Sequence, residues 1–185
     1  MIYSGYKITN RNMTCRGYHF ELGKEHVHSG PVKICQSGFH FCENPIHCFA
    51  YYSNPLGDKR LFKIVSRGKH DKRPGGDKVT GSKIEFIEEI TDIPKFLHEY
   101  LKERLESSHG DDYLYKMAPS IVDLVNVQFL LPETRDLLEE AITRSDYVSY
   151  SLANLRDRLH FIRSKGIVGF GSRSMEYIYG MRPHL

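Results

Sequence analysis

Cysteine and histidine side chains, which can bind metal ions or act as nucleophiles, gather between residues 35 and 55. The segment CQSGFHFCENPIHCFAYYSNP holds three of the four cysteines and two of the ten histidines. Structural zinc sites usually bring their ligands in pairs separated by roughly two to four residues. Here Cys35 and Cys42 have six residues between them, and Cys42 and Cys48 have five. We therefore expect no metal site, and thiols buried as small apolar side chains are the alternative.

His40 is the second candidate for chemistry in this segment. Gly38 permits a turn, and the residues FHF that follow indicate a strand in which His40 faces away from the two phenylalanines. A helix is expected directly afterwards, because Asn44 is a good N-cap. An imidazole beside the free N–H groups of a helix start suits a planar base or a phosphate. The alternative is a hydrogen-bonded histidine of the core.

Two halves of the chain position these residues. Up to about Thr91, short runs of β-branched and aromatic residues alternate with glycines, which predicts strands and turns. After Asp92 the apolar residues recur at helical spacing. We expect helices over IPKFLHEYLKERLES, over SIVDLVNVQFLL with Ser120 as its cap, from Pro132, and from about Tyr147 to Lys165, with HGDDYLYKMAP as a connection.

Composition excludes little about function. The net charge of +3 is too small to indicate nucleic-acid binding by itself. The most basic stretch, Lys63 to Lys78, predicts a solvated loop, with a phosphate or nucleic-acid contact as the alternative. No apolar run approaches the roughly 18 residues of a membrane span, so we expect no membrane partner. The first ten residues lack the pattern of a signal peptide, so we expect a cytoplasmic protein.

Several blocks of the first half resemble a known group of proteins. The blocks GYKITNRNMTCRGYHFELGK, CQSGFHFCENP and VTGSKIEFIEEI look like a family of small, uncharacterised proteins of phages and bacteria, over about the first 90 residues. The resemblance implies a phage or bacterial origin, and with it the cytoplasm of a bacterial host as the location. It implies no assigned activity.

The order of the blocks also resembles the ADP-ribosyltransferase fold. In that superfamily, a first strand carries a cation that holds NAD, a strand and helix resembling GFHFCENPIHCFAYY follow, and a later strand carries a catalytic glutamate. The block CRGY would place Arg16 or His19 in the first role. His40 stands where the superfamily has a tyrosine that stacks on nicotinamide. The block EFIEEI would supply the glutamate, at Glu85 or, with a shifted alignment, at one of the following glutamates, Glu88 or Glu89.

This second resemblance implies a definite chemistry with NAD as the substrate. Transfer of ADP-ribose passes through an oxocarbenium-like state, which a carboxylate stabilises. We expect Glu85 to be that carboxylate and Arg16 to bind the pyrophosphate, because a guanidinium binds phosphate in bidentate fashion. His40, Tyr51 and Tyr52 are the expected aromatic contacts of nicotinamide. As alternatives, Glu85 is an exposed strand residue, Arg16 an ion-pair partner, and the tyrosines pack on their helix.

We thus expect an α+β protein, with a mixed β-sheet domain over residues 1–92, implied to be ADP-ribosyltransferase-like, and a helical subdomain with a C-terminal tail over 93–185. The first functional hypothesis is an ADP-ribosyltransferase-like enzyme of a phage or bacterium, acting on a host macromolecule. The second is a non-catalytic phage protein that binds and inhibits a host factor, such as a defence protein. An enzyme requires Arg16, His40 and Glu85 to converge within a few ångströms, whereas a binding protein does not.

Overall fold

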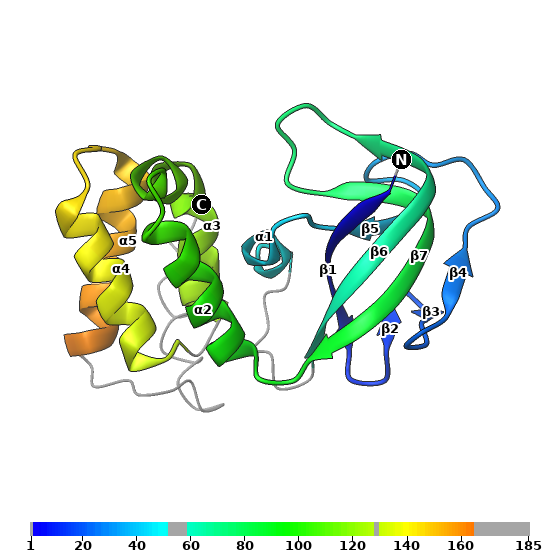
Figure 1. The fold of residues 1–185 in the computed structure, drawn as a ribbon, viewed down its shortest axis with the longest axis horizontal. Helices are drawn as coiled ribbons and strands as arrows, with labels where there is room; N and C mark the ends of the chain where they lie inside the picture. Colours follow the sequence, from blue (N-terminus) through cyan, green and yellow to red (C-terminus); the bar gives the residue numbers. More distant parts are fainter. Residues whose placement is uncertain (1, 52–58, 128–129, 165–185) are drawn as a thin grey trace, which may run out of the picture. The chain divides into compact units, whose positions relative to one another are not determined.

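The computed structural model describes residues 2–51, 59–127 and 130–164. The chain divides into two compact units, Met1–Leu97 and His98–Leu185. A β-sheet forms most of the first unit and α-helices form the second (Figure 1). The predicted α+β class is therefore confirmed, and the predicted domain boundary between residues 92 and 93 stays a prediction.

Five strands form the sheet in the described part of the first unit. They are β1 (Tyr3–Asn10), β6 (Lys59–Lys72), β7 (Val79–Ile90) and β4 (Glu25–Val27) in that order, with β5 (Phe39–Phe41) also paired to β7. All the ladders between these strands are antiparallel. Among the described residues, parallel pairing is confined to one isolated bridge, between Leu22 and Phe86. The expectation of a mixed sheet is therefore wrong, because each strand runs antiparallel to the strand with which it pairs.

The sheet curls until its two sides meet near one end. Strand β7 pairs with β6 along one edge and with β4 and β5 along the other. Beyond β5, the Tyr6 N–H of β1 donates to the Cys42 carbonyl at 2.7 Å, and the Cys42 N–H donates to the Tyr6 carbonyl at 2.9 Å. A small hairpin of β2 (Thr14–Cys15) and β3 (Tyr18–His19) packs against β1. The result is a partly closed barrel, strongly curved in Figure 1.

Aromatic rings fill the inner side of this curl. The Phe86 ring lies 4.7 Å from the Phe20 ring and 5.1 Å from the Phe62 ring, measured between centroids, and all three side chains are buried. Strand alternation explains the pattern, since Ile84 and Phe86 point inward while the residues between and beyond them point outward. The other buried members of this cluster are Phe39, Phe41, Ile64, Val79 and Ile84.

A short helix, α1 (Pro45–Phe49), follows β5 directly. The Asn44 side chain accepts a hydrogen bond from the Ile46 N–H at 2.9 Å, so the predicted N-cap is confirmed. Pro45, Ile46, Cys48 and Phe49 are buried. The helix ends at Phe49, with Ala50 as its C-cap.

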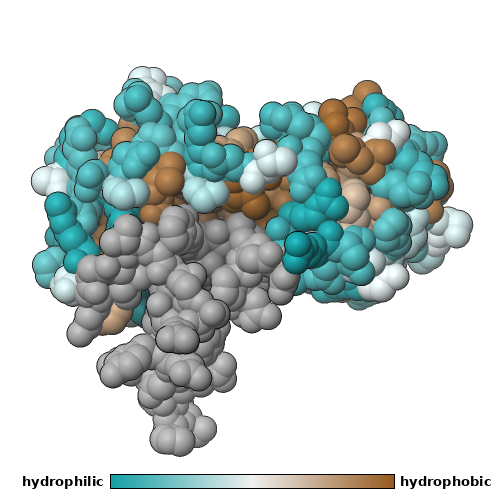
Figure 2. Space-filling model, turned by 90° about the horizontal axis from the view of Figure 1, so that it is seen from below, coloured by the Kyte–Doolittle hydropathy of each residue, from teal (hydrophilic) through white to brown (hydrophobic). Residues whose placement is uncertain are grey.

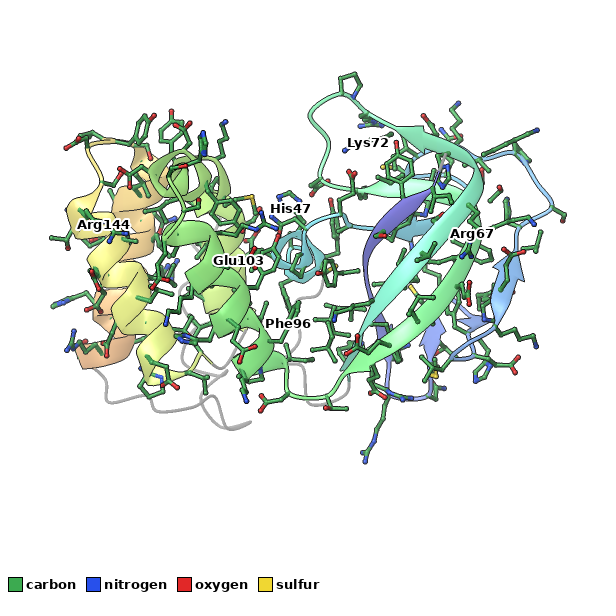
Figure 3. The ribbon with its side chains drawn as sticks, in the orientation of Figure 1. His47, Arg67, Lys72, Phe96, Glu103 and Arg144 are labelled. Atoms are coloured by element: carbon green, nitrogen blue, oxygen red, sulfur yellow. The ribbon has the colours of Figure 1, made fainter. Side chains whose placement is uncertain are left out.

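The helix α2 (Ile93–Leu105) begins after Asp92, whose carboxylate accepts a hydrogen bond from the Lys95 N–H at 3.1 Å. Its first turn belongs to the sheet unit, where the Phe96 ring (Figure 3) lies 5.7 Å from the Tyr6 ring of β1. The predicted apolar stripe is confirmed by the burial of Ile93, Leu97, Leu101 and Leu105.

In its described residues, the second unit contains the rest of α2 and three further helices, namely α3 (Gly110–Val127), α4 (Pro132–Arg144) and α5 (Tyr150–Ser164). Helix α5 packs on α3 and α4 through the predicted stripe, all of it buried: Leu152, Leu155, Leu159 and Ile162. The prediction of a connection before Ser120 is wrong, because α3 already begins at Gly110 and runs through Pro119. Acidic residues in the first turn favour this helix, and the burial of Leu114, Ala118 and Ile121 outweighs the hydrogen bond that Pro119 removes.

The face seen in Figure 2 is mostly hydrophilic, with hydrophobic side chains in smaller areas between. Single exposed apolar residues are ordinary for a folded chain. In the described part of the chain, every helix is too short or too polar to cross a membrane.

Candidate functional site

The sheet unit contains a cavity of about 540 Å³. Its walls come chiefly from β1, the β2–β3 hairpin, the loop before β5, β5 itself and the end of α1, with Lys78 directly before β7. Three basic side chains, Lys7, Arg16 and Lys78, line it, and no described lining residue is a carboxylate. The remaining lining residues are Tyr6, Ile8, Asn10, Thr14, Cys15, Tyr18, Phe20, His28, Cys35, Gln36, Ser37, Gly38, Phe39, His40, Phe41, Cys42, Cys48 and Tyr51. The sign of this charge favours an anionic ligand.

Lys7 is the basic residue in the deepest position. Its side chain comes from the centre of β1 and is only 6% exposed. Its ammonium donates a hydrogen bond to the His40 carbonyl at 2.6 Å and lies 5.4 Å from the centre of the Phe20 ring. Burial lowers the pKa of this amine, while the nearby thiols, chiefly Cys15, oppose the shift.

His40 belongs to the wall of the cavity and holds the loop before it. Its Nε2 accepts a hydrogen bond from the Cys35 N–H at 2.9 Å, so the neutral ring carries its proton on Nδ1. Cys35 has a left-handed φ of 64°, which such a bond helps to hold. Burial, and then the charges of Lys7, Arg16 and Lys78, lower the pKa of His40 to about 4. The ring is thus a neutral acceptor at neutral pH, as the alternative of a hydrogen-bonded core histidine predicts.

This depressed pKa predicts how acid acts on the protein. An unfolded histidine has a pKa near 6.5, so the unfolded chain binds the extra proton between about pH 6.5 and pH 4. The free energy of unfolding should therefore fall as the pH drops through that range. After a discount for partial exposure, the loss from His40 should be about 1–2 kcal/mol.

Urea unfolding of the wild type and His40→Gln at pH 7 and pH 4.5 measures this loss. Glutamine can still accept from the Cys35 N–H but does not titrate. The pKa values of His47 and His70 are also lowered by burial, so only the difference between the two proteins is informative. Equal pH dependence in both proteins would contradict the assignment.

Arg16 lies at the tip of the β2–β3 hairpin. Arg16 and Gly17 form its two-residue turn, with left-handed φ values of 50° and 78°. Such turns match the twist of the paired strands, but they require a positive φ at both residues. Glycine adopts a positive φ without strain, which explains why Gly17 follows Arg16. Arg16 is exposed at the cavity, and hence its guanidinium can reach a ligand from the rim.

Tyr51 is held at the cavity by two polar neighbours. Its hydroxyl donates to the Asp77 carboxylate, and the Lys78 ammonium lies 4.1 Å from the centre of its ring. Burial and this carboxylate raise the pKa of Tyr51, so the phenol stays protonated. Tyr52, the other predicted aromatic contact, lies outside the described residues.

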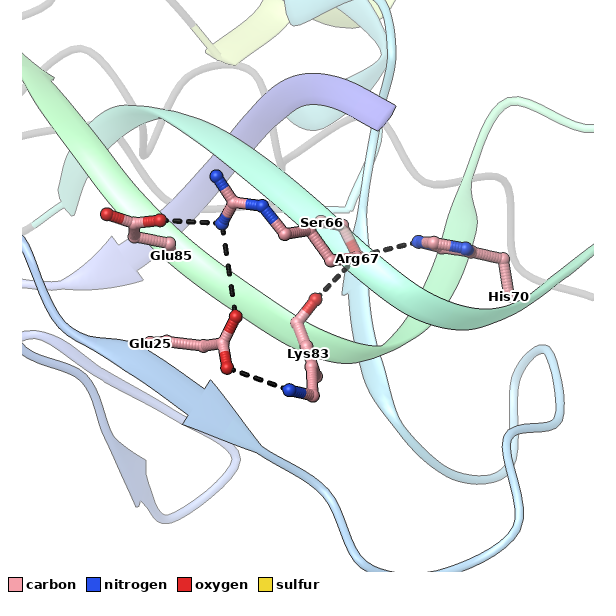
Figure 4. A network of polar contacts seen from close by, with 6 residues as sticks. All are labelled: Glu25, Ser66, Arg67, His70, Lys83 and Glu85. Atoms are coloured by element: carbon pink, nitrogen blue, oxygen red, sulfur yellow. Dashed lines mark hydrogen bonds and ion pairs between the residues drawn. The ribbon is translucent and has the colours of Figure 1, made fainter. Parts of the chain in front are cut away.

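Glu85 does not line this cavity. It points from the outer face of β7, opposite to its inward neighbours Ile84 and Phe86, and its carboxylate pairs with Arg67 at 2.7 Å. Arg67 also lies 3.9 Å from Glu25 of β4, which pairs with Lys83 at 3.0 Å (Figure 4). The structure therefore brings Arg16, His40 and Tyr51 to one cavity and leaves Glu85 in an ion-pair network on the other face of the strand.

The basic stretch from Lys63 to Lys78 is not a loop through most of its length. Strand β6 extends to Lys72, and β7 begins at Val79. Lys63, Arg67 and Lys72 form ion pairs with Glu88, Glu85 and Glu43, respectively. The prediction of a loop is wrong because a strand whose solvated side chains are charged has the same composition as a basic loop. A nucleic-acid contact through this stretch stays a prediction.

The cysteines differ from one another. Cys42 and Cys48 are buried, as expected of small apolar side chains, whereas Cys35 is exposed. The Cys48 thiol donates to the Tyr6 carbonyl at 3.5 Å, and burial raises its pKa well above the ordinary value. Within the described residues, no three His, Cys, Asp or Glu side chains are placed to share a metal ion.

Sequence reasoning missed Lys7 and Lys78 as cavity residues. Lys7 lies in the run YKIT, where the sequence offers no signal that separates a buried lysine from a solvated one. It also missed a close Ser66–His70 pair on β6, with 2.9 Å between Oγ and Nε2 (Figure 4). Ser66 is fully buried and donates to the Lys83 carbonyl at 2.7 Å, so this pair stabilises the sheet and gives no substrate access.

Comparison with known proteins places the chain in a family. The model of one family, described as a domain of unknown function (DUF7666), matches residues 3–99. No curated protein and no solved structure matches the chain, so the resemblance to ADP-ribosyltransferases rests on the sequence blocks alone. The matched residues span the whole sheet and the cavity described above. The chain therefore belongs to the DUF7666 family, whose domain is the sheet unit that holds the basic cavity.

Proposed function

We propose that the sheet unit binds a small anionic ligand with a planar ring, of the nucleotide class, in this cavity. The observation that carries the proposal is a cavity lined by Lys7, Arg16 and Lys78, with no carboxylate among its described lining residues. Cations gathered in a concave, partly apolar site attract phosphate strongly, because the low dielectric constant of the walls focuses their field. A volume of about 540 Å³ is in the range of ordinary small-molecule sites.

The side chains suggest a division of roles. Arg16 at the rim offers a planar fork of donors, which suits bidentate binding of a phosphate. Lys78 lies over the Tyr51 ring and supplies a second charge near the same wall. A planar ring can contact the faces and edges of aromatic lining side chains, chiefly those of Tyr18, Phe20 and Phe39.

The position of Glu85 favours binding without ADP-ribosyl transfer. A catalytic carboxylate must lie beside the ribose, whereas Glu85 is on the opposite face of β7 and is paired with Arg67. The proposal therefore follows the non-catalytic hypothesis, with NAD retained as one candidate ligand. A host protein as the partner of this chain stays a prediction, because the cavity supports only a small ligand.

Titration calorimetry of the full chain tests the proposal. The probes are inorganic phosphate, AMP, NAD and adenosine, at low and at physiological salt. AMP or NAD should bind more tightly than adenosine, by about tenfold or more, because charge-assisted hydrogen bonds to phosphate are strong. Higher salt should weaken the binding. If neither phosphate nor any nucleotide binds, the proposal is wrong.

Incubation with labelled NAD and bacterial lysate belongs beside this titration. On the proposal, no label should be transferred to protein or nucleic acid. Transfer that Glu85→Gln abolishes would instead establish the enzyme hypothesis. Transfer that survives Glu85→Gln would direct attention to Glu88 or Glu89.

Arg16→Ala should weaken binding of the phosphate-bearing probe about tenfold, which corresponds to about 1.4 kcal/mol. The reason is the loss of a bidentate donor at an exposed hairpin tip, where little packing is lost. Arg67→Ala is the matched control, because Arg67 projects from the opposite face, where it pairs with Glu85. Calorimetry of the three proteins checks the prediction, and equal loss in both variants would show only a general effect of charge.

A further inference from the structure

Lys7 is an unusual lysine because it is buried without an acidic partner. Its side chain is 6% exposed, and in the described parts of the chain no carboxylate forms an ion pair with it. Buried lysines are rare and are normally paired, since an isolated ammonium loses its hydration. Its neighbours are instead a carbonyl, the Phe20 ring and the thiols of Cys15, Cys42 and Cys48.

Burial lowers the pKa of the Lys7 amine, against the opposing effect of the nearby thiols, and so raises its neutral fraction. Desolvation penalises only the charged form, and the positive charge of Arg16 acts in the same direction. A neutral lysine amine has a lone pair and is a nucleophile toward carbonyl carbon. Because Lys7 also lines the cavity, a bound ligand can meet that lone pair.

We infer that Lys7 forms an imine with a phosphorylated aldehyde or ketone bound in the cavity. This inference rests on the proposed function for the part that binds the anion. Arg16 and Lys78, the other two basic side chains of the cavity, are the groups that would hold the phosphate. The carbonyl group would then lie toward the inner end, where Lys7 donates to the His40 carbonyl.

The chemistry is balanced without any further reactant. The Lys7 nitrogen attacks the carbonyl carbon, a C–N bond forms, and the carbonyl π electrons move to oxygen. Water carries a proton from nitrogen to that oxygen, which gives a carbinolamine. The hydroxyl group and the second N–H hydrogen then leave as water, and a C=N bond replaces the C–O bond. No oxidation or reduction occurs.

Pyridoxal 5′-phosphate is a suitable probe, because it carries an aldehyde, a planar ring and a phosphate. The full chain is incubated with the probe at pH 7, reduced with borohydride and analysed by peptide mapping. Label should appear on Lys7 faster than on exposed lysines such as Lys83, since burial lowers the pKa of the Lys7 amine and so raises its neutral fraction. AMP should suppress it, and pyridoxal without the phosphate should label Lys7 more slowly.

Two variants separate reaction from folding. Lys7→Arg keeps a cation that cannot form an imine, and Lys7→Met fills the space with an apolar chain. Lys83→Arg, on the outer face beside Glu25, is the matched control and should react like the wild type. Circular dichroism shows whether each variant folds, and the mapping of wild-type protein stands even if both Lys7 variants unfold.

The outcomes distinguish this inference from the proposed function. Label on Lys7 that AMP suppresses supports both. Nucleotide binding in the calorimeter, with label spread over exposed lysines or located on Lys78, overturns the inference and leaves the proposed function intact. A third outcome is label on Lys7 that is unchanged by AMP and by removal of the phosphate from the probe. That result would show a reactive amine in a cavity that does not bind anions, and it overturns the inference as stated. No nucleotide binding and no label on Lys7 overturn both.

Discussion

Phe86→Ala is expected to lower the free energy of unfolding of the sheet unit by about 3–5 kcal/mol. Phe86 is fully buried, and its ring lies 4.7 Å from the Phe20 ring and 5.1 Å from the Phe62 ring. Removing the ring leaves a void between Phe62 of β6 and Phe20, which lines the cavity. Such a void costs both the transfer free energy of the ring and the contacts that its neighbours lose.

Ile87→Ala is the matched control for this substitution. Ile87 is the next residue along β7, points to the other face and is 48% exposed. Its truncation should change stability by less than about 1 kcal/mol. Urea unfolding followed by far-UV circular dichroism measures both variants. Similar losses would show that the sheet is not packed with Phe86 inside, and the position of the cavity would then be wrong as well.

Gly38→Ala is expected to destabilise the sheet unit by about 3 kcal/mol and to abolish ligand binding. Gly38 has a φ of +94°, which an L side chain rarely adopts. A Cβ there would lie 2.6 Å from Thr80 Oγ1 and 3.1 Å from the Gly81 carbonyl. Thr80 cannot easily move, because it is buried and its hydroxyl donates to the Ser37 carbonyl at 3.0 Å. The loop before β5, which includes part of the cavity wall, must therefore shift.

Gly75→Ala separates backbone strain from crowding. Gly75 also has a positive φ, of +67°, but an added Cβ would meet nothing within 4 Å. It should cost only the strain, about 1–2 kcal/mol, and leave ligand binding unchanged. Thermal unfolding and calorimetry of both variants provide the comparison. Equal costs at the two glycines would mean that the contact of Gly38 with β7 is looser than the distances indicate.

The sequence by itself determined the local features of this protein. The Asn44 cap, the turn at Gly38 and the apolar stripe of α5 all depend on residues within a few positions of one another. The stability of each feature depends largely on interactions among these neighbouring residues, and the period of the helix can be counted along the chain. The α+β class followed from the change of period near residue 92, for the same reason.

Strand faces were decided by the tertiary structure. The run SKIEFIEEI of β7 has isoleucines in both phases of the alternation, so the pattern does not choose an inner face. The choice comes from Phe86, which meets Phe20 and Phe62 from distant segments. It also comes from a bulge in β7, where Ile87 is the extra residue opposite the step from Lys63 to Ile64 of β6. That choice places Glu85 with Arg67, away from the cavity that contains Arg16, His40 and Tyr51.

The chemical character of Lys7 likewise depends on the whole sheet unit. Within the run YKIT it is a lysine in a strand, with nothing to show whether it is solvated. Its burial arises because the hairpin, β5 and α1 close around β1 and exclude water from its amine. Desolvation is a sum over groups that are distant in sequence and close in space, and only the folded chain brings those groups together.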